Sequence, residues 1–274
     1  MTSRSRVRWS TLLLGVLAVV WLYPVAWTLA NAIRSSADIY RAPWDIPLPP
    51  AIGNIGEAWD RGHLGVAIVN STYVTGMTVA IVLALAVTGA YSLAVLRPPG
   101  RPVLLVLVLA PLMIPTEVLI VPLFSMFRTL GLINSLPGLA ITNAVASISF
   151  ATVILAGYFR TIHRDVIDAA RVDGAGRVDV LLRMVIPLAR PGILAVAVLV
   201  GVFAWNDFAG ALVLMQRPET FTIQLALTRF STFYATDEGL TFAGVAIAIL
   251  PPLLLFLLLR GPFIRGVGTG TTRR

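Results

Sequence analysis

Residues 66–96 read VAIVNSTYVTGMTVAIVLALAVTGAYSLAVL, a largely apolar run without a charged side chain. A helix of about 20 residues, rising about 1.5 Å per residue, crosses the roughly 30 Å hydrocarbon core of a bilayer. This run therefore predicts a membrane-spanning helix. Five further stretches are long and apolar enough to do the same: residues 11–32, 103–127, 137–159, 188–215 and 240–259. The sequence predicts an all-α membrane protein with six transmembrane helices.

The composition of the 274-residue chain excludes the usual soluble classes. Hydrophobic residues make up 57% of it and charged residues 12%, against about 45–50% and about 25% in typical soluble domains. Cysteine is absent, which excludes disulfides, thiolate metal ligands and cysteine nucleophiles. The net charge of +8 comes from arginines in short loops between apolar runs. We therefore expect membrane lipid, and no nucleic acid, around this chain.

The arginines divide unequally between the two sides of the predicted bundle. Fifteen of the 21 fall on the side of the N-terminus and six on the other. Because cytoplasmic loops carry an excess of basic residues, both termini are predicted to be cytoplasmic, in a multi-pass protein of the cell (inner) membrane. The predicted layout is a cytoplasmic N-terminus at residues 1–10, a six-helix domain at 11–265 and a cytoplasmic tail at 266–274.

Two segments on the predicted outer side are long. Residues 33–65 are rich in Pro and Trp, and residues 216–239 carry Glu219, Asp237 and Glu238. Ordered surfaces for an external partner and simple hydrated loops both fit such segments. The residues alone leave these two interpretations open.

One inner loop, residues 160–187, predicts a helix, a turn and a second helix. Its second half has apolar residues spaced for one helix face: Val178, Leu181, Leu182 and Val185. Its first half suggests a shorter amphipathic helix, with Ile162, Val166, Ala169 and Ala170. Gly174 lies between them, where a chain reversal favours a residue that tolerates positive φ. Such a hairpin rests on lipid headgroups or docks a soluble protein, and the pattern fits both.

Within this loop, five residues resemble the EAA motif of ABC-importer permeases. An acid precedes two alanines, a glycine follows six positions after the acid, and a proline nineteen after it: Asp168, Ala169, Ala170, Gly174 and Pro187. Asp168 replaces the usual Glu of the motif, and Leu181 stands where an aromatic residue is frequent. The resemblance implies a cytoplasmic coupling-helix hairpin between the fourth and fifth spans.

In that family the hairpin docks on an ATP-binding subunit. The resemblance assigns ATPase coupling to the motif residues together with Arg171 and Asp173, and hairpin anchoring to Val178, Leu181, Leu182 and Val185. The chain has no lysine and no Walker-type phosphate-binding loop, so it binds no nucleotide by that motif. ATP and Mg²⁺ are therefore expected on partner ATPase subunits, and this chain is expected to bind no cofactor.

Further stretches resemble the carbohydrate (MalG-like) branch of these permeases. They are residues 113–135, the run Trp205-Asn206-Asp207-Phe208, and the ending around Phe263-Ile264-Arg265-Gly266. The resemblance implies a heterodimer with a second homologous permease, two ATP-binding subunits and an extracytoplasmic solute-binding protein or lipoprotein. The implied cargo is a sugar or oligosaccharide. A polyol, an amino sugar or a glycerophosphodiester is the alternative cargo.

Two carboxylates are expected at membrane depth, where a charge costs about 2.5–3.5 kcal/mol on insertion scales. Glu117 and Asp207 fit a polar substrate pathway, with Asn143, Trp205 and Asn206 nearby. The structural alternative is that Glu117 caps a proline-broken helix and Asp207 bonds across helices. A membrane enzyme using both carboxylates is a third possibility, although no enzyme motif accompanies them. No catalytic residue and no metal site is predicted, since His63 and His163 lack ligand spacing.

Overall fold

The computed structural model describes residues 3–45, 48–231 and 236–268, with side chains other than those of 3–10, 116–117 and 258–268. The predicted N-terminus at 1–10 and tail at 266–274 therefore lie partly outside the described residues. Within the described ranges every regular element is helical, apart from an isolated bridge between Ser231 and Thr236. The protein is an all-helical membrane protein.

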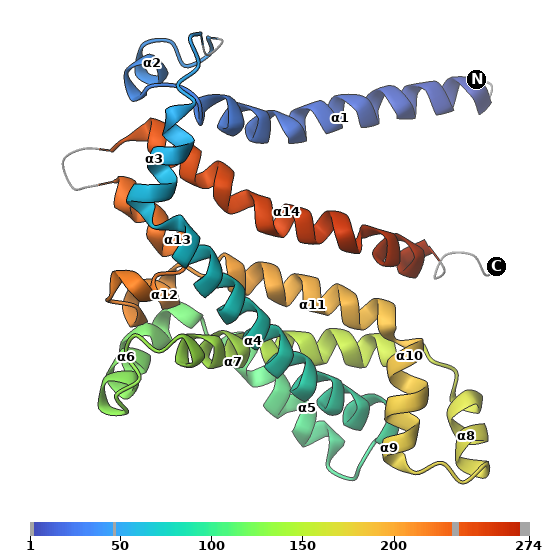
Figure 1. Ribbon diagram of the computed structural model, residues 1–274. Coiled ribbons are helices and arrows are strands. Elements are labelled where there is room, and N and C mark those ends of the chain that lie inside the picture. The colour runs from blue at the N-terminus through green and yellow to red at the C-terminus, as the bar shows by residue number, and fades with distance from the viewer. Residues whose placement is uncertain (1–2, 46–47, 232–235, 269–274) are drawn as a thin grey trace. The chain divides into compact units, whose positions relative to one another are not determined.

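Four of the predicted spans are long, apolar helices (Figure 1). They are α1 (Ser3–Asn31), α4 (Leu64–Tyr91) continued by the π-helix η1 (Ser92–Leu96), α7 (Leu136–Phe159) and α14 (Glu238–Gly268). Each starts or ends within a few residues of the predicted limits on at least one side. Length and composition alone qualify these four for crossing a membrane.

The predicted third span, residues 103–127, is not one continuous helix. It consists of α5 (Arg101–Leu109), the 3₁₀ turns η2 (Ala110–Met113) and η3 (Thr116–Leu119), and α6 (Ile120–Thr129). Ile114 is extended, with φ −99° and ψ 117°, because the residue before a proline avoids the helical region. Pro111 and Pro115 also lack the N–H groups that a continuous helix requires. The predicted third span is therefore broken at these prolines.

The predicted fifth span, residues 188–215, is also divided. It begins in a helix made of α9 (Arg177–Asp179), the π-helix η4 (Val180–Val185) and α10 (Ile186–Leu188). That helix meets α11 (Arg190–Trp205) at a 77° bend. After α11 the chain breaks at residues 206–208 and resumes as α12 (Ala209–Leu214). With the bent pair counted as one span, the described residues hold up to five candidate spans.

The chain divides into two compact units, and residues 66–225 form the main part of one of them. In this unit α7 and α11 pack along each other. Small residues let helix backbones approach closely in a membrane, and a glycine lies at this contact. Gly192 of α11 lies so near Tyr158 of α7 that an added Cβ would be 2.6 Å from the ring. The buried Thr78 hydroxyl donates to the Ala140 carbonyl at 3.1 Å and ties α4 to α7.

The other unit contains residues 1–65 and 226–250. The long segment 33–65 is ordered into α2 (Ser36–Arg41) and α3 (Gly53–Gly62). Arg34, only 4% exposed, donates to the carbonyls of Ala42 at 2.6 Å and Asp38 at 3.0 Å. Ser36 Oγ donates to Asp237 Oδ1 at 2.8 Å and joins this segment to the start of α14. The 3₁₀ turn η6 (Leu227–Phe230) contacts α3 in the same unit.

Candidate functional site

The segment with the acid-Ala-Ala motif forms two helices joined by a tight turn (Figure 1). The first is α8 (Arg164–Val172), and the second is the α9–η4–α10 helix, residues 177–188. We call the whole segment, Arg164 to Leu188, the α8–α10 loop. Gly174 has φ +86° in the turn, as its position predicted. The two helices contact each other, since α8 packs against η4.

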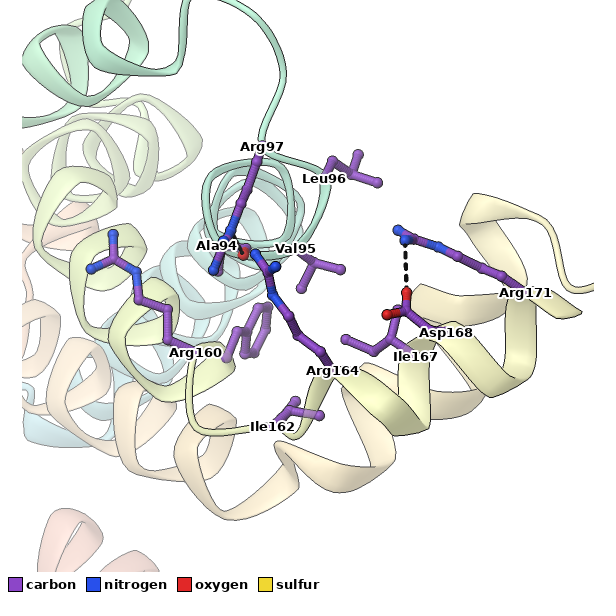
Figure 2. A pocket seen from close by; sticks show the side chains of 11 residues that line it. Ala94, Val95, Leu96, Arg97, Arg160, Ile162, Arg164, Ile167, Asp168 and Arg171 are labelled. Atoms are coloured by element: carbon purple, nitrogen blue, oxygen red, sulfur yellow. Dashed lines mark hydrogen bonds and ion pairs between the residues drawn. The ribbon is translucent and has the colours of Figure 1, made fainter.

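The motif residues of α8 present an exposed surface. Asp168 and Arg171 form an ion pair at 3.2 Å, drawn in Figure 2, with side chains 64% and 46% exposed. Ala169, Asp173 and Gly174 are exposed too, and Val172 is 88% exposed. A single exposed apolar side chain is ordinary on a protein surface, so the interest of Val172 lies in its place beside the motif residues. Val172 was not among the residues selected from the sequence.

The buried face of the α8–α10 loop differs from the predicted stripe. Val185 is buried and Leu181 packs partly on the core, but Val178 is 67% exposed and Leu182 56% exposed. The prediction assumed a 3.6-residue period, whereas residues 180–185 form a π-helix. Its i to i+5 bonding brings Val180 and Val185 to the same side, and these two are 1% and 0% exposed. Val178 and Leu182 therefore do not pack on this core.

In α8 the inward residue is Ile167, at 5% exposure, rather than the predicted Val166, which is 39% exposed. Ala170 and Ile162 pack partly on the same core, while Ala169 is exposed. This core also contains Tyr91, whose hydroxyl donates to the Arg177 carbonyl at 2.9 Å. Pro187 is exposed in α10, two residues before the bend into α11. The loop is thus packed on the ends of α4 and α7 through residues that the sequence pattern only partly identified.

The polar residues predicted at membrane depth lie in different environments. Trp205 is 6% exposed at the end of α11 and is part of the packed interior. Asn206 caps that helix, since its Nδ2 donates to the Val202 carbonyl at 2.8 Å. Its Oδ1 accepts from Gln224 Nε2 at 3.1 Å. The side chain of Glu117 lies outside the described residues.

Asn143 and Asp207 are brought together, from α7 and from the break between α11 and α12. Asp207 Oδ1 accepts from the Gly210 backbone N–H at 3.0 Å and caps the first turn of α12. The Asn143 side chain faces the same carboxylate. Asn143 Nδ2 and Asp207 Oδ2 are both buried and lack well-formed hydrogen bonds among the described residues. Buried polar atoms are nearly always satisfied, so this donor and this acceptor either pair with each other after a small side-chain shift or bind a further polar group.

A second cluster, missed by sequence reasoning, organises residues 216–223. Asn134 has φ 65°, and its Oδ1 accepts from the backbone N–H groups of Gln216 at 2.6 Å and Arg217 at 2.8 Å. Asn70 Nδ2 donates to the carbonyls of Glu219 and Phe221, near the 3₁₀ turn η5 (Pro218–Thr220). The Ile223 N–H, at the start of α13 (Ile223–Ala226), donates to Ser71 Oγ at 2.8 Å. The sequence did hold one signal for this cluster. Asn134 follows Gly131-Leu132-Ile133, and Asn tolerates a positive φ.

Comparison with known proteins finds relatives over nearly the whole chain. A family model described as binding-protein-dependent transport system inner membrane component matches residues 76–267. The chain is 31% identical to the probable ABC transporter permease protein YurM of Bacillus subtilis, over 97% of this chain and 87% of the relative. It is 30% identical to the diacetylchitobiose uptake system permease protein NgcG of Streptomyces coelicolor, over 95% and 87%.

Among solved structures, the chain has the fold of a chain from a bacterial ABC transporter involved in the import of the acidic polysaccharide alginate. The TM-score is 0.79 at 23% identity, with 95% of this chain and 98% of that chain covered. Since the family model spans well over half of the sequence and the curated relatives nearly all of it, this protein belongs to the family of binding-protein-dependent transport system inner membrane components.

Proposed function

We propose that this chain is one of two permease subunits that form the translocation pathway of an ATP-driven importer for an oligosaccharide. The observation that carries this proposal is the exposed α8 surface around Asp168 and Val172, on a chain whose family serves binding-protein-dependent transport. The family is one of transport-system membrane components and not of enzymes. The alternative of an intramembrane enzyme built on Glu117 and Asp207 is therefore abandoned.

The proposed cargo rests on relatives. The Streptomyces coelicolor relative is named for uptake of diacetylchitobiose, and the solved transporter of the same fold for import of alginate. Both names describe chains of linked sugar units. A sugar oligomer is therefore favoured for this chain over a polyol or a glycerophosphodiester, while an amino sugar remains compatible with the diacetylchitobiose relative.

The proposed topology has six spans with both termini in the cytoplasm. Four long helices supply four, and α11 continued by α12 supplies the fifth. The sixth is the broken α5–α6 segment, because discontinuous helices are tolerated in membranes where neighbours or cavities satisfy the freed backbone groups. The excess of arginines on the side of the termini supports the orientation. In this topology the α8–α10 loop lies at the cytoplasmic surface.

The proposed complex contains a second homologous permease, two ATP-binding subunits and an extracytoplasmic binding protein or lipoprotein. ATP and Mg²⁺ bind the ATPase subunits. The surface formed by Asp168, Ala169, Arg171, Val172 and Asp173 docks on one of them. Tyr91, Val180 and Val185 transmit its movement to the transmembrane helices, because they are buried contacts between loop and bundle.

The proposed pathway includes Asn143 and Asp207. Their buried, unsatisfied amide nitrogen and carboxylate oxygen match the acceptor and donor of a sugar hydroxyl. Asn206 is exposed at the same helix break and offers a further polar contact. Residues 216–223, held by Asn134 and Asn70, form part of the outer surface for the binding protein.

The test is reconstitution of the chain in proteoliposomes with its companion permease, ATPase and binding protein, followed by uptake of radiolabelled sugar oligomers. We expect uptake that requires both ATP and the binding protein. Flux catalysed by this chain alone, without nucleotide or companions, would refute the proposal. A complex that transports only glycerophosphodiesters or polyols would support the proposed ATP-driven importer but contradict the proposed sugar cargo.

A further inference from the structure

A cavity of about 230 Å³ lies between η1 at the end of α4, the end of α7, and α8 (Figure 2). Four arginines line it, Arg97, Arg160, Arg164 and Arg171, against one carboxylate, Asp168. This cavity is separate from the Asn143–Asp207 pair, and it shares two residues, Asp168 and Arg171, with the α8 surface proposed to dock on the ATPase.

The positive charge around the cavity is poorly compensated. Asp168 is already paired with Arg171. Within the described part of the chain, Arg160 and Arg164 make no ion pair or side-chain hydrogen bond. The cavity therefore has three more positive groups than negative ones. Like charges held around a common space repel one another, and a bound anion removes that repulsion.

Arg97 is held toward this space by an unusual backbone. Its φ is +49°, which is uncommon for a residue other than glycine. Its N–H donates to the Ser92 carbonyl at 2.9 Å, and its Nε donates to the Ala94 carbonyl at 3.1 Å. The two terminal guanidinium nitrogens have no partner among the described residues. Figure 2 shows the guanidinium groups of Arg97 and Arg164 directed to the same region beside Ala94.

The rest of the cavity wall is apolar. Leu96, Ile162 and Ile167 line it together with Phe159. It lies at the ends of two candidate spans, Leu64–Leu96 and Leu136–Phe159, which is where lipid headgroups meet a membrane protein. A basic pocket with an apolar edge at that depth matches a phospholipid, whose phosphate is charged and whose glycerol and acyl carbons are not.

We propose that this cavity binds the phosphate of an anionic phospholipid of the inner leaflet. Arg97 and Arg164 contact the phosphate oxygens, and the apolar wall contacts the glycerol and the first acyl carbons. Because Arg164 belongs to α8 and Arg97 to the end of α4, the bound lipid joins the α8–α10 loop to the bundle. Anionic lipid then fixes the position of α8.

The test uses the purified, delipidated full-length chain in a neutral detergent. Retention of dioctanoyl phosphatidylglycerol is measured by native mass spectrometry, with dioctanoyl phosphatidylcholine and inorganic phosphate as the other probes. We expect phosphatidylglycerol to be retained and phosphatidylcholine not. Arg97→Gln with Arg164→Gln is expected to weaken retention at least about tenfold, since each lost charged contact contributes roughly that factor.

The matched control is Arg183→Gln with Arg190→Gln, which removes two charges from the same stretch of chain without touching the cavity. It is expected to retain the lipid like the wild type. Arg97→Lys with Arg164→Lys keeps the charge and guards against misfolding, so it should lose less than the Gln pair. Phosphate that binds alone and displaces the lipid would keep the anion site but overturn the lipid assignment. No retention, or equal loss in the control, would overturn the site altogether.

Discussion

The hydroxyl of Tyr91, at the end of α4, donates a 2.9 Å hydrogen bond to the carbonyl of Arg177, at the start of α9. Tyr91 is 4% exposed and lies in the core that also contains Ile167 and Val185. A single buried side chain thus holds the second helix of the α8–α10 loop to a transmembrane helix. If the loop receives movement from an ATPase, this bond lies on the route into the bundle.

Tyr91→Phe is expected to weaken this link while keeping the ring in the core. Loss of one buried hydrogen bond costs about 1 kcal/mol, or roughly a fivefold change in an equilibrium. We predict fewer solute molecules imported per ATP hydrolysed by the reconstituted complex. Tyr73→Phe is the control, because Tyr73 lies on the same helix, is 48% exposed and has no hydrogen bond among the described residues. Equal coupling ratios in both variants would contradict this role of Tyr91.

Gly192→Ala tests the close packing of α11 on α7. The new methyl would lie 2.6 Å from the Tyr158 ring, so overpacking is expected to cost about 1–3 kcal/mol. Gly157→Ala on α7 is the control, since its Cβ would meet nothing within 4 Å. Thermal unfolding of the purified chain in detergent measures the stability of both variants. Adding Tyr158→Ala should relieve much of the Gly192→Ala effect, and a strictly additive double variant would contradict the packing explanation.

Substitutions of Asn134 separate backbone from side-chain effects in the outer cluster. Asn134→Gly keeps the positive φ but loses the acceptor for Gln216 and Arg217, whereas Asn134→Asp keeps an acceptor. Asn134→Ala loses both the tolerance of positive φ and the acceptor, so it is expected to have the largest effect. We predict that the binding-protein concentration for half-maximal ATPase stimulation rises about fivefold in Asn134→Ala, for a loss of roughly 1 kcal/mol. An unchanged concentration in all three variants would separate this cluster from binding-protein docking.

Asp207→Asn tests whether the Asn143–Asp207 pair serves transport or only structure. The amide oxygen still accepts from the Gly210 N–H, so the cap of α12 and the thermal stability should be kept. Uptake is expected to fall about tenfold, because a charged acceptor for a sugar hydroxyl is lost. Asp207→Ala should lower both uptake and stability. Normal uptake by a stable Asp207→Asn variant would leave Asp207 with a capping role alone.

Much of the fold follows from composition, because about 20 consecutive apolar residues have few alternatives to a membrane helix. The positive φ of Gly174 was likewise predictable from its place between two helical patterns. The breaks within the helices could not be predicted in this way. Pro111 and Pro115 signalled a distortion, but the sequence could not tell a kinked helix from the broken α5–α6 segment.

The site was predictable as a segment and less so as individual side chains. The motif around Asp168 located the loop, yet the 3.6-residue period selected Val178 and Leu182, which are exposed. A π-helix depends on the neighbours that a segment packs against, so its phase shift is not visible in a local pattern. The contacts of Asn134 and Tyr91 join residues more than 80 positions apart, which no local pattern can pair.

The central claim is that energy from a partner ATPase enters through the exposed surface of α8. It is tested most directly by Asp168→Arg with Val172→Glu, since both side chains are exposed and their replacement should not disturb the fold of the chain. The charge reversal Glu57→Arg in α3 is the control. We predict that the double variant loses copurification with the ATPase and ATP-driven uptake, while the control keeps both. Wild-type copurification and uptake in the double variant would contradict the account.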